Sequence, residues 1–75
     1  MIEELKLVSL LEDLPKHGLQ KGDLGTVVFI HKQGEAYEVE FMTLEGETIS
    51  VITVLPHQVR QVGPREIAQS RVLAV

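Results

Sequence analysis

The stretch GDLGTVVFIHKQGEAYEVEFM, residues 22–42, decides the fold class of this chain. Its first part places glycines directly before a β-branched and aromatic run, which predicts a strand over about residues 26–31. Its last part, residues 36–42, alternates apolar and acidic side chains, which is typical of a strand with one buried and one solvated face. The polar residues 32–35 include a glycine and are expected to connect the two strands as a hairpin loop.

Further β segments are expected on both sides of this hairpin. The stretch TISVITVL, residues 48–55, is the most strongly β-forming window, and residues 56–59 then suffice for one 3-10 turn before a short strand at residues 60–62. Upstream, LKLVSLLEDL at residues 5–14 fits both helical spacing and alternation. We predict a strand there, because a first strand can pair with the others, whereas a short isolated helix is marginal.

Together these segments predict an all-β domain, a small five-stranded SH3-like barrel over residues 1–62 with a 3-10 turn before the last strand. Curling the sheet into a barrel removes most exposed strand edges. A domain of this size without cysteine needs that arrangement, because no disulfide can stabilise it.

The C-terminal tail, residues 63–75, is expected to be docked or partly ordered. It begins with a Gly-Pro pair, which ends the preceding strand. Its apolar side chains are too numerous for a free terminus, so we expect them to dock on the barrel or on a second copy of the chain, which would give a homo-oligomer. These residues are Ile67, Val72, Leu73 and Val75.

The composition argues against several classes of function. Eleven acidic residues against seven basic ones give a net charge of −4, which opposes binding to a phosphate backbone. The absence of cysteine excludes thiolate metal sites and cysteine nucleophiles. No apolar run approaches the roughly 18 to 20 residues that span a bilayer, and the first residues lack a basic leader region, so we expect no membrane association and a cytoplasmic protein.

Several sequence blocks resemble a bacterial family of small stand-alone proteins known only as a domain of unknown function. The blocks are LEDLPKHGL at residues 11–19, GDLGTVV at 22–28, YEVEF at 37–41 and QVR at 58–60, and the resemblance extends over about residues 5–62. The strand pattern is also similar to the barrels of electron-transport accessory subunits and of the nitrile hydratase beta subunit. In those proteins the barrel binds and positions a larger partner, so the resemblance implies protein binding at the level of the fold alone. It also implies a protein partner encoded by an adjacent gene, as for many toxin neutralisers.

Three histidines are the first candidates for chemistry. His17, His31 and His57 lack the close spacing of zinc-ligand pairs, so we interpret them as half-exposed polar rings and predict no metal and no cofactor. No serine or threonine lies in a nucleophile motif. We therefore predict that the protein is not an enzyme.

Four acidic residues form the candidate partner-binding surface. They are Glu38, Glu40, Glu45 and Glu47. An acidic sheet face can steer a basic partner during association. The alternative interpretation is a solvated face that only keeps the protein soluble.

The glycines of the first quoted stretch are interpreted as structural. Gly22, Asp23 and Gly25 are expected to form a turn, because glycine tolerates positive φ and aspartate can bond to its own backbone two residues on.

The expected function is a non-catalytic protein-binding module, a neutralising or accessory partner of a neighbouring gene product. The alternative is a nucleic-acid-binding barrel of the KOW type, and the scarcity of basic and aromatic residues argues against it.

Overall fold

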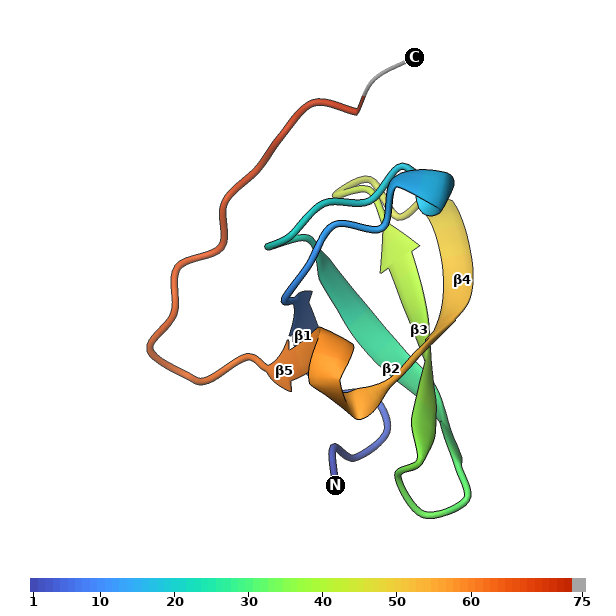
Figure 1. Cartoon of the computed structure of the whole chain (residues 1–75). Coiled ribbons are helices and arrows are strands. Elements are labelled where there is room, and N and C mark those ends of the chain that lie inside the picture. The colour runs from blue at the N-terminus through green and yellow to red at the C-terminus, as the bar shows by residue number, and fades with distance from the viewer. Residues whose placement is uncertain (74–75) are drawn as a thin grey trace.

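Five antiparallel strands form one sheet in the computed structural model, which describes residues 1–73 (Figure 1). The strands are β1 (Leu7–Leu10), β2 (Leu24–His31), β3 (Ala36–Met42), β4 (Thr48–Val54) and β5 (Val59–Gln61), and the 3-10 turns are η1 (Pro15–His17) and η2 (Pro56–Gln58). The strand order in the sheet is β4-β3-β2-β1-β5. The prediction of a five-stranded all-β domain with a 3-10 turn before the last strand is therefore confirmed.

The sheet is curled, because its two edge strands in the described part of the chain, β4 and β5, are joined by a short connection. The link from Val54 to Val59 contains a 3-10 turn and can span only about 13 Å. A flat sheet of five strands would hold its edges about 19 Å apart. The sheet therefore bends until its edges approach each other, and Figure 1 shows η2 bridging from the end of β4 to β5.

The concave face of the sheet holds the core. The predicted alternation of β3 is observed, since Tyr37, Val39 and Phe41 are all buried. They pack with the other buried apolar side chains, which are Val8, Leu10, Leu19, Val27, Ile52, Val54 and Val59. Every buried member of this cluster therefore precedes the tail.

A β-bulge in β2 turns one aromatic side chain outward. Val27 pairs with Val39 and Phe29 pairs with Glu38, so Val28 is an extra residue between consecutive partners. Without it, Phe29 would share the inner face with Val27, which is fully buried. With it, Phe29 lies on the outer face and is 51% exposed.

The connection between β1 and β2 is compact rather than an open loop. Pro15 starts η1, and Gly18 ends it in the left-handed conformation with a φ of 68°. Leu14 and Leu19 then form an isolated bridge, and Leu19 enters the core. This connection holds the backbone of residues 18–23 in a defined shape at one end of the sheet.

The tail runs along the outside of the domain without regular secondary structure as far as Leu73 (Figure 1). Ile67 and Val72 are each 94% exposed, so these two side chains do not dock on their own domain; a second copy remains the other expectation. Val75, the last apolar residue of that prediction, lies outside the described residues. Across residues 1–73, no helix has the length and apolar character that crossing a membrane requires.

Candidate functional site

The convex side of the sheet carries a surface that we call the outer face. It is built from two rows of cross-strand neighbours, whose side chains project on the same side of the sheet. The rows are Phe29, Glu38 and Thr53, and Leu7, Thr26, Glu40 and Val51. The sheet register thus places apolar and acidic side chains next to each other.

The apolar part of the outer face is well exposed. Phe29 and Val51 each leave about half of their surface in solvent, at 51% and 52%, and Leu7 leaves 48%. The Phe29 ring also packs edge-on against the ring of His31, with centroids 5.0 Å apart. The rest of the Phe29 side chain remains open to solvent.

Glu38 is held in the middle of this face by two donors. The Thr53 hydroxyl donates to its Oε2, and the Nε2 of His31 lies 2.7 Å from the same oxygen. The Thr53 hydroxyl and then the His31 ring hold the pKa of Glu38 below its ordinary value. Glu38 is therefore a fixed negative charge at neutral pH.

Glu40 is fixed in a similar way. The Thr48 hydroxyl donates to its Oε2 over 2.6 Å. A carboxylate that is already oriented loses less conformational entropy when it meets a cation than a free side chain does. The two glutamates of β3 are thus prepared to recognise a positive charge.

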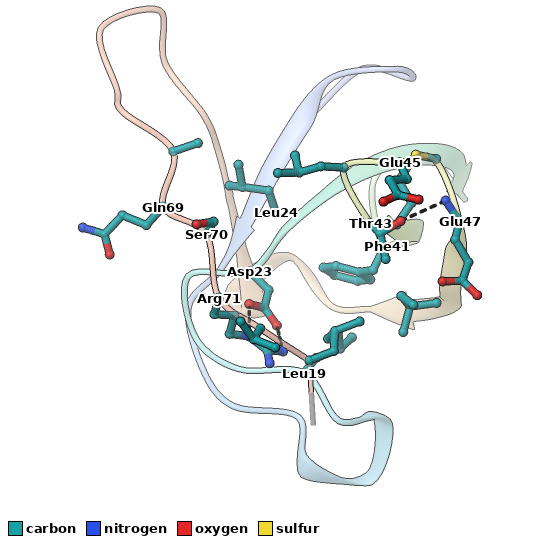
Figure 2. A pocket seen from close by; sticks show the side chains of 16 residues that line it. Leu19, Asp23, Leu24, Phe41, Thr43, Glu45, Glu47, Gln69, Ser70 and Arg71 are labelled. Atoms are coloured by element: carbon teal, nitrogen blue, oxygen red, sulfur yellow. Dashed lines mark hydrogen bonds and ion pairs between the residues drawn. The ribbon is translucent and has the colours of Figure 1, made fainter. Parts of the chain in front are cut away.

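Glu45 and Glu47, the other half of the predicted acidic surface, lie elsewhere. They belong to the turn between β3 and β4, which is closed by hydrogen bonds between the Thr43 and Glu47 backbones and from the Glu47 amide to the Thr43 hydroxyl. Both acids line an open groove of about 730 Å³ between this turn and the tail (Figure 2). The structure therefore divides the four predicted acids between two surfaces.

The groove has an apolar floor and acidic sides. Leu19, Leu24, Phe41 and Ile49 line it from the domain, and residues 68–73 of the tail line it from outside. Figure 2 shows Asp23 and Arg71 facing each other beside Leu19, with Glu45 and Glu47 on the opposite side. The tail covers the groove only in part.

Arg71 of the tail binds a pair of acceptors that we call the arginine socket, the carboxylate of Asp23 and the carbonyl of Gly18. Its Nε donates to Oδ1 of Asp23 over 2.8 Å and its Nη2 donates to Oδ2 over 2.6 Å. The same Nη2 also donates to the Gly18 carbonyl over 3.1 Å. The Arg71 guanidinium holds the pKa of Asp23 below its ordinary value, aided by the Gln20 amide and opposed by partial burial.

The predicted turn of Gly22, Asp23 and Gly25 is only partly a turn. Gly22 has a φ of 92°, as a turn glycine does, and the Asp23 carboxylate accepts the Gln20 amide over 2.8 Å. Gly25, in contrast, lies within β2, opposite Val8. Close packing requires a glycine at this position, because an added Cβ would lie 2.9 Å from Phe41 Cε1 and still closer to Val39.

The three histidines lie apart, one in η1, one at the end of β2 and one in η2. Among residues 1–73, no group of three His, Asp or Glu side chains is arranged to hold a metal ion. His31 joins the outer face through Glu38, and His17 lies beside Gly18 and Arg71 in the hollow next to the groove.

Sequence patterns identified the acids of both surfaces but missed the aromatic side chain of the outer face and the tail arginine at the groove. The four-residue apolar run 27–30 held a signal for Phe29, because a strand with one wet face cannot bury all four. Arg71 and the Gly18 carbonyl gave no such signal, because the two residues are 53 positions apart in the chain and come into contact only in the folded structure.

The fold defines a small all-β domain that carries two candidate surfaces. The chain belongs to the family described as a domain of unknown function (DUF4926), whose model matches residues 4–61. This confirms the resemblance to such a family that the sequence blocks indicated. No curated protein matches the chain. No solved structure matches it either.

Proposed function

We propose that this protein is a non-catalytic protein-binding domain and that the outer face is its binding surface. The observation that carries the proposal is that two half-exposed apolar side chains, Phe29 on β2 and Val51 on β4, flank the oriented carboxylates of β3. Aromatic anchors surrounded by polar groups are typical of the energetic centres of protein interfaces. The complementary partner surface has apolar side chains and at least one lysine or arginine.

A partner encoded by an adjacent gene, which this protein neutralises or assists, is the narrower form of the proposal. The support for this narrower form is the family resemblance. It can be tested directly. Co-expression with the adjacent gene product is expected to yield a complex and, where that product is toxic, to restore growth. Growth that stays inhibited, with no complex formed, contradicts the narrower form alone.

The main test compares three forms of the protein in affinity capture from the native host. The double variant F29S/V51S removes the apolar anchors, and Ile67→Ser, at a 94% exposed position in the tail, is the matched control. We expect one polypeptide to be recovered stoichiometrically with the wild type and with the control, and to be lost with the double variant. Thermal unfolding followed by circular dichroism shows that each variant is folded. Equal recovery by all three forms, or no recovery by any, contradicts the proposal.

Binding to nucleic acid is tested separately at low ionic strength, where contacts to phosphate are strongest. The outer face presents Glu38 and Glu40, and the chain has a net charge of −4. We expect no mobility shift of RNA or DNA. A shift that weakens steeply with salt would favour the nucleic-acid alternative over protein binding.

A further inference from the structure

The arginine socket is formed by the domain itself rather than by the tail. The Asp23 carboxylate is oriented by the Gln20 amide, and the Gly22 amide donates to the Leu10 carbonyl over 2.9 Å. Gly18 is held by the hydrogen bond from its amide to the Pro15 carbonyl, over 3.2 Å. All these contacts lie within residues 10–23, so the acceptors are in place before an arginine arrives.

The tail shows which ligand chemistry fits this site. Arg71 fills the socket with bidentate geometry, which selects a guanidinium over an ammonium. Two residues later, Leu73 lines the groove together with Leu19 and Ile49. The matching motif is an arginine followed two positions on by an aliphatic side chain, in an extended segment.

The tail is held lightly enough to be displaced. Beyond Glu66, which pairs with Arg60, Arg71 makes the only hydrogen bonds between the described part of the tail and the domain. Residues 67–70 between these points are exposed, and no buried core residue belongs to the tail. Releasing the tail therefore leaves the core unchanged.

A segment of another protein is a better candidate occupant of the site than the tail of a second copy of this chain. A second copy's tail makes the same contacts, but the chain's own tail is present at a higher effective concentration. A different protein can add contacts that the tail lacks. In residues 1–73, no cation lies within 4 Å of Glu45 or Glu47, although both line the groove.

We propose that the arginine socket and the groove form a second binding site, which takes an extended, arginine-bearing segment of a partner protein. The tail, residues 68–73, is a built-in competitor that occupies the site until the partner displaces it. This site does not share residues with the outer face. The F29S/V51S variant is therefore expected to keep it, so that either proposal can fail without the other.

The probe is a labelled peptide of residues 66–73, EIAQSRVL, with acetylated and amidated ends, titrated against the full-length protein by fluorescence polarisation. Arg71→Gln in the protein empties the socket and is expected to increase the affinity for the peptide at least five-fold over the wild type. Arg65→Gln, at an exposed position of the same tail, is the control and is expected to bind like the wild type. Adding Asp23→Asn to Arg71→Gln, or replacing the arginine of the peptide by glutamine, is expected to abolish binding.

Three results would overturn the proposal. The first is equal affinity of the wild type and Arg71→Gln for the peptide, and the second is no binding to a folded Arg71→Gln protein. The third is a wild-type dimer in sedimentation that Arg71→Gln abolishes, because the occupant would then be the tail of a second copy. Backbone amide NMR spectra establish that each variant keeps its fold.

Discussion

Several carboxylates in this protein are oriented by hydrogen bonds from nearby protein donors. Glu38 and Glu40 accept threonine hydroxyls, Asp23 accepts a backbone amide and a guanidinium, and Glu66 accepts Arg60 and the Gly63 amide. Hydrogen bonds to the charged form of an acid lower its pKa. The pKa values of Glu38, Asp23 and Glu66 are lowered in this way. The hydrogen bonds also hold all four carboxylates in fixed directions.

Glu66 gives a direct test of this arrangement. Its bidentate pair with Arg60 and its bond from the Gly63 amide lower its pKa from 4.5 to about 2. Because the folded-state pKa is the lower one, the stabilisation is present above about pH 4.5 and is lost as the pH falls toward 2. We expect carboxyl ¹³C NMR to give a midpoint near 2 in the wild type. Arg60→Gln is expected to move it back toward the ordinary value, and an ordinary midpoint in both proteins would show that the pair does not form.

Gly25 gives a second test at the same scale. Alanine there would bring its Cβ to 2.9 Å from Phe41 Cε1 and into Val39, with the Glu40 carbonyl at 3.1 Å. Overpacking of this kind costs about 1–3 kcal/mol, so we expect Gly25→Ala to lower the free energy of unfolding by that amount. The measurement is urea denaturation. Gly63→Ala is the control, because the one atom near its Cβ would be Oε2 of the exposed Glu66 side chain, at 3.3 Å, and a change of about 0.5 kcal/mol or less is expected.

At the scale of the elements, strands with regular patterns could be predicted and irregular segments could not. The strand at Ala36–Met42 has the bounds that its alternation predicts, and the next strand, Thr48–Val54, ends one residue earlier than predicted. The segment of residues 5–14, whose spacing allowed a helix or a strand, is a strand at Leu7–Leu10. Pairing on both sides decides this, since β1 lies between β2 and β5.

The candidate surfaces were less predictable, because they depend on departures from those patterns. The bulge at Val28 reverses the orientation of Phe29, and a second irregularity between Phe41 and Met42 shifts the register with β4. A bulge has no fixed sequence signature within a continuous apolar run. Glu38 and Glu40 could be assigned to a wet face, whereas the aromatic anchor beside them could not.

The central position of β1 predicts unequal effects for two adjacent leucines. Leu10 is 1% exposed and faces the core, whereas Leu11 is 39% exposed. We expect Leu10→Ala to lower the free energy of unfolding by about 2–5 kcal/mol and Leu11→Ala by about 1 kcal/mol or less. Chemical denaturation of both variants is the measurement. Similar losses for the two would contradict the strand register of β1.

For the whole molecule, the two proposed surfaces are separate. The outer face lies on the convex side of the sheet, and the groove opens where the β1–β2 connection, the β3–β4 turn and the tail meet. The acidic residues that lie close together in the sequence, at residues 38–47, are divided between the two surfaces. Only the three-dimensional arrangement separates them, because the β3–β4 turn carries Glu45 and Glu47 away from the face that holds Glu38 and Glu40.

The division between a folded domain and a displaceable tail predicts the result of removing the tail. In the part of the chain that the structure describes, all ten buried core residues and every strand lie within residues 1–62. The tail is attached through two surface ion pairs, one of them partly buried, and such pairs contribute little to stability in water. A chain ending at Val62 is therefore expected to unfold cooperatively, with a melting temperature less than about 10 °C below that of the full chain. Circular dichroism or scanning calorimetry measures both quantities. A broad, non-cooperative transition would show that the tail is part of the folded core. The tail could then not leave the arginine socket without unfolding the domain, which would contradict its role as a displaceable competitor.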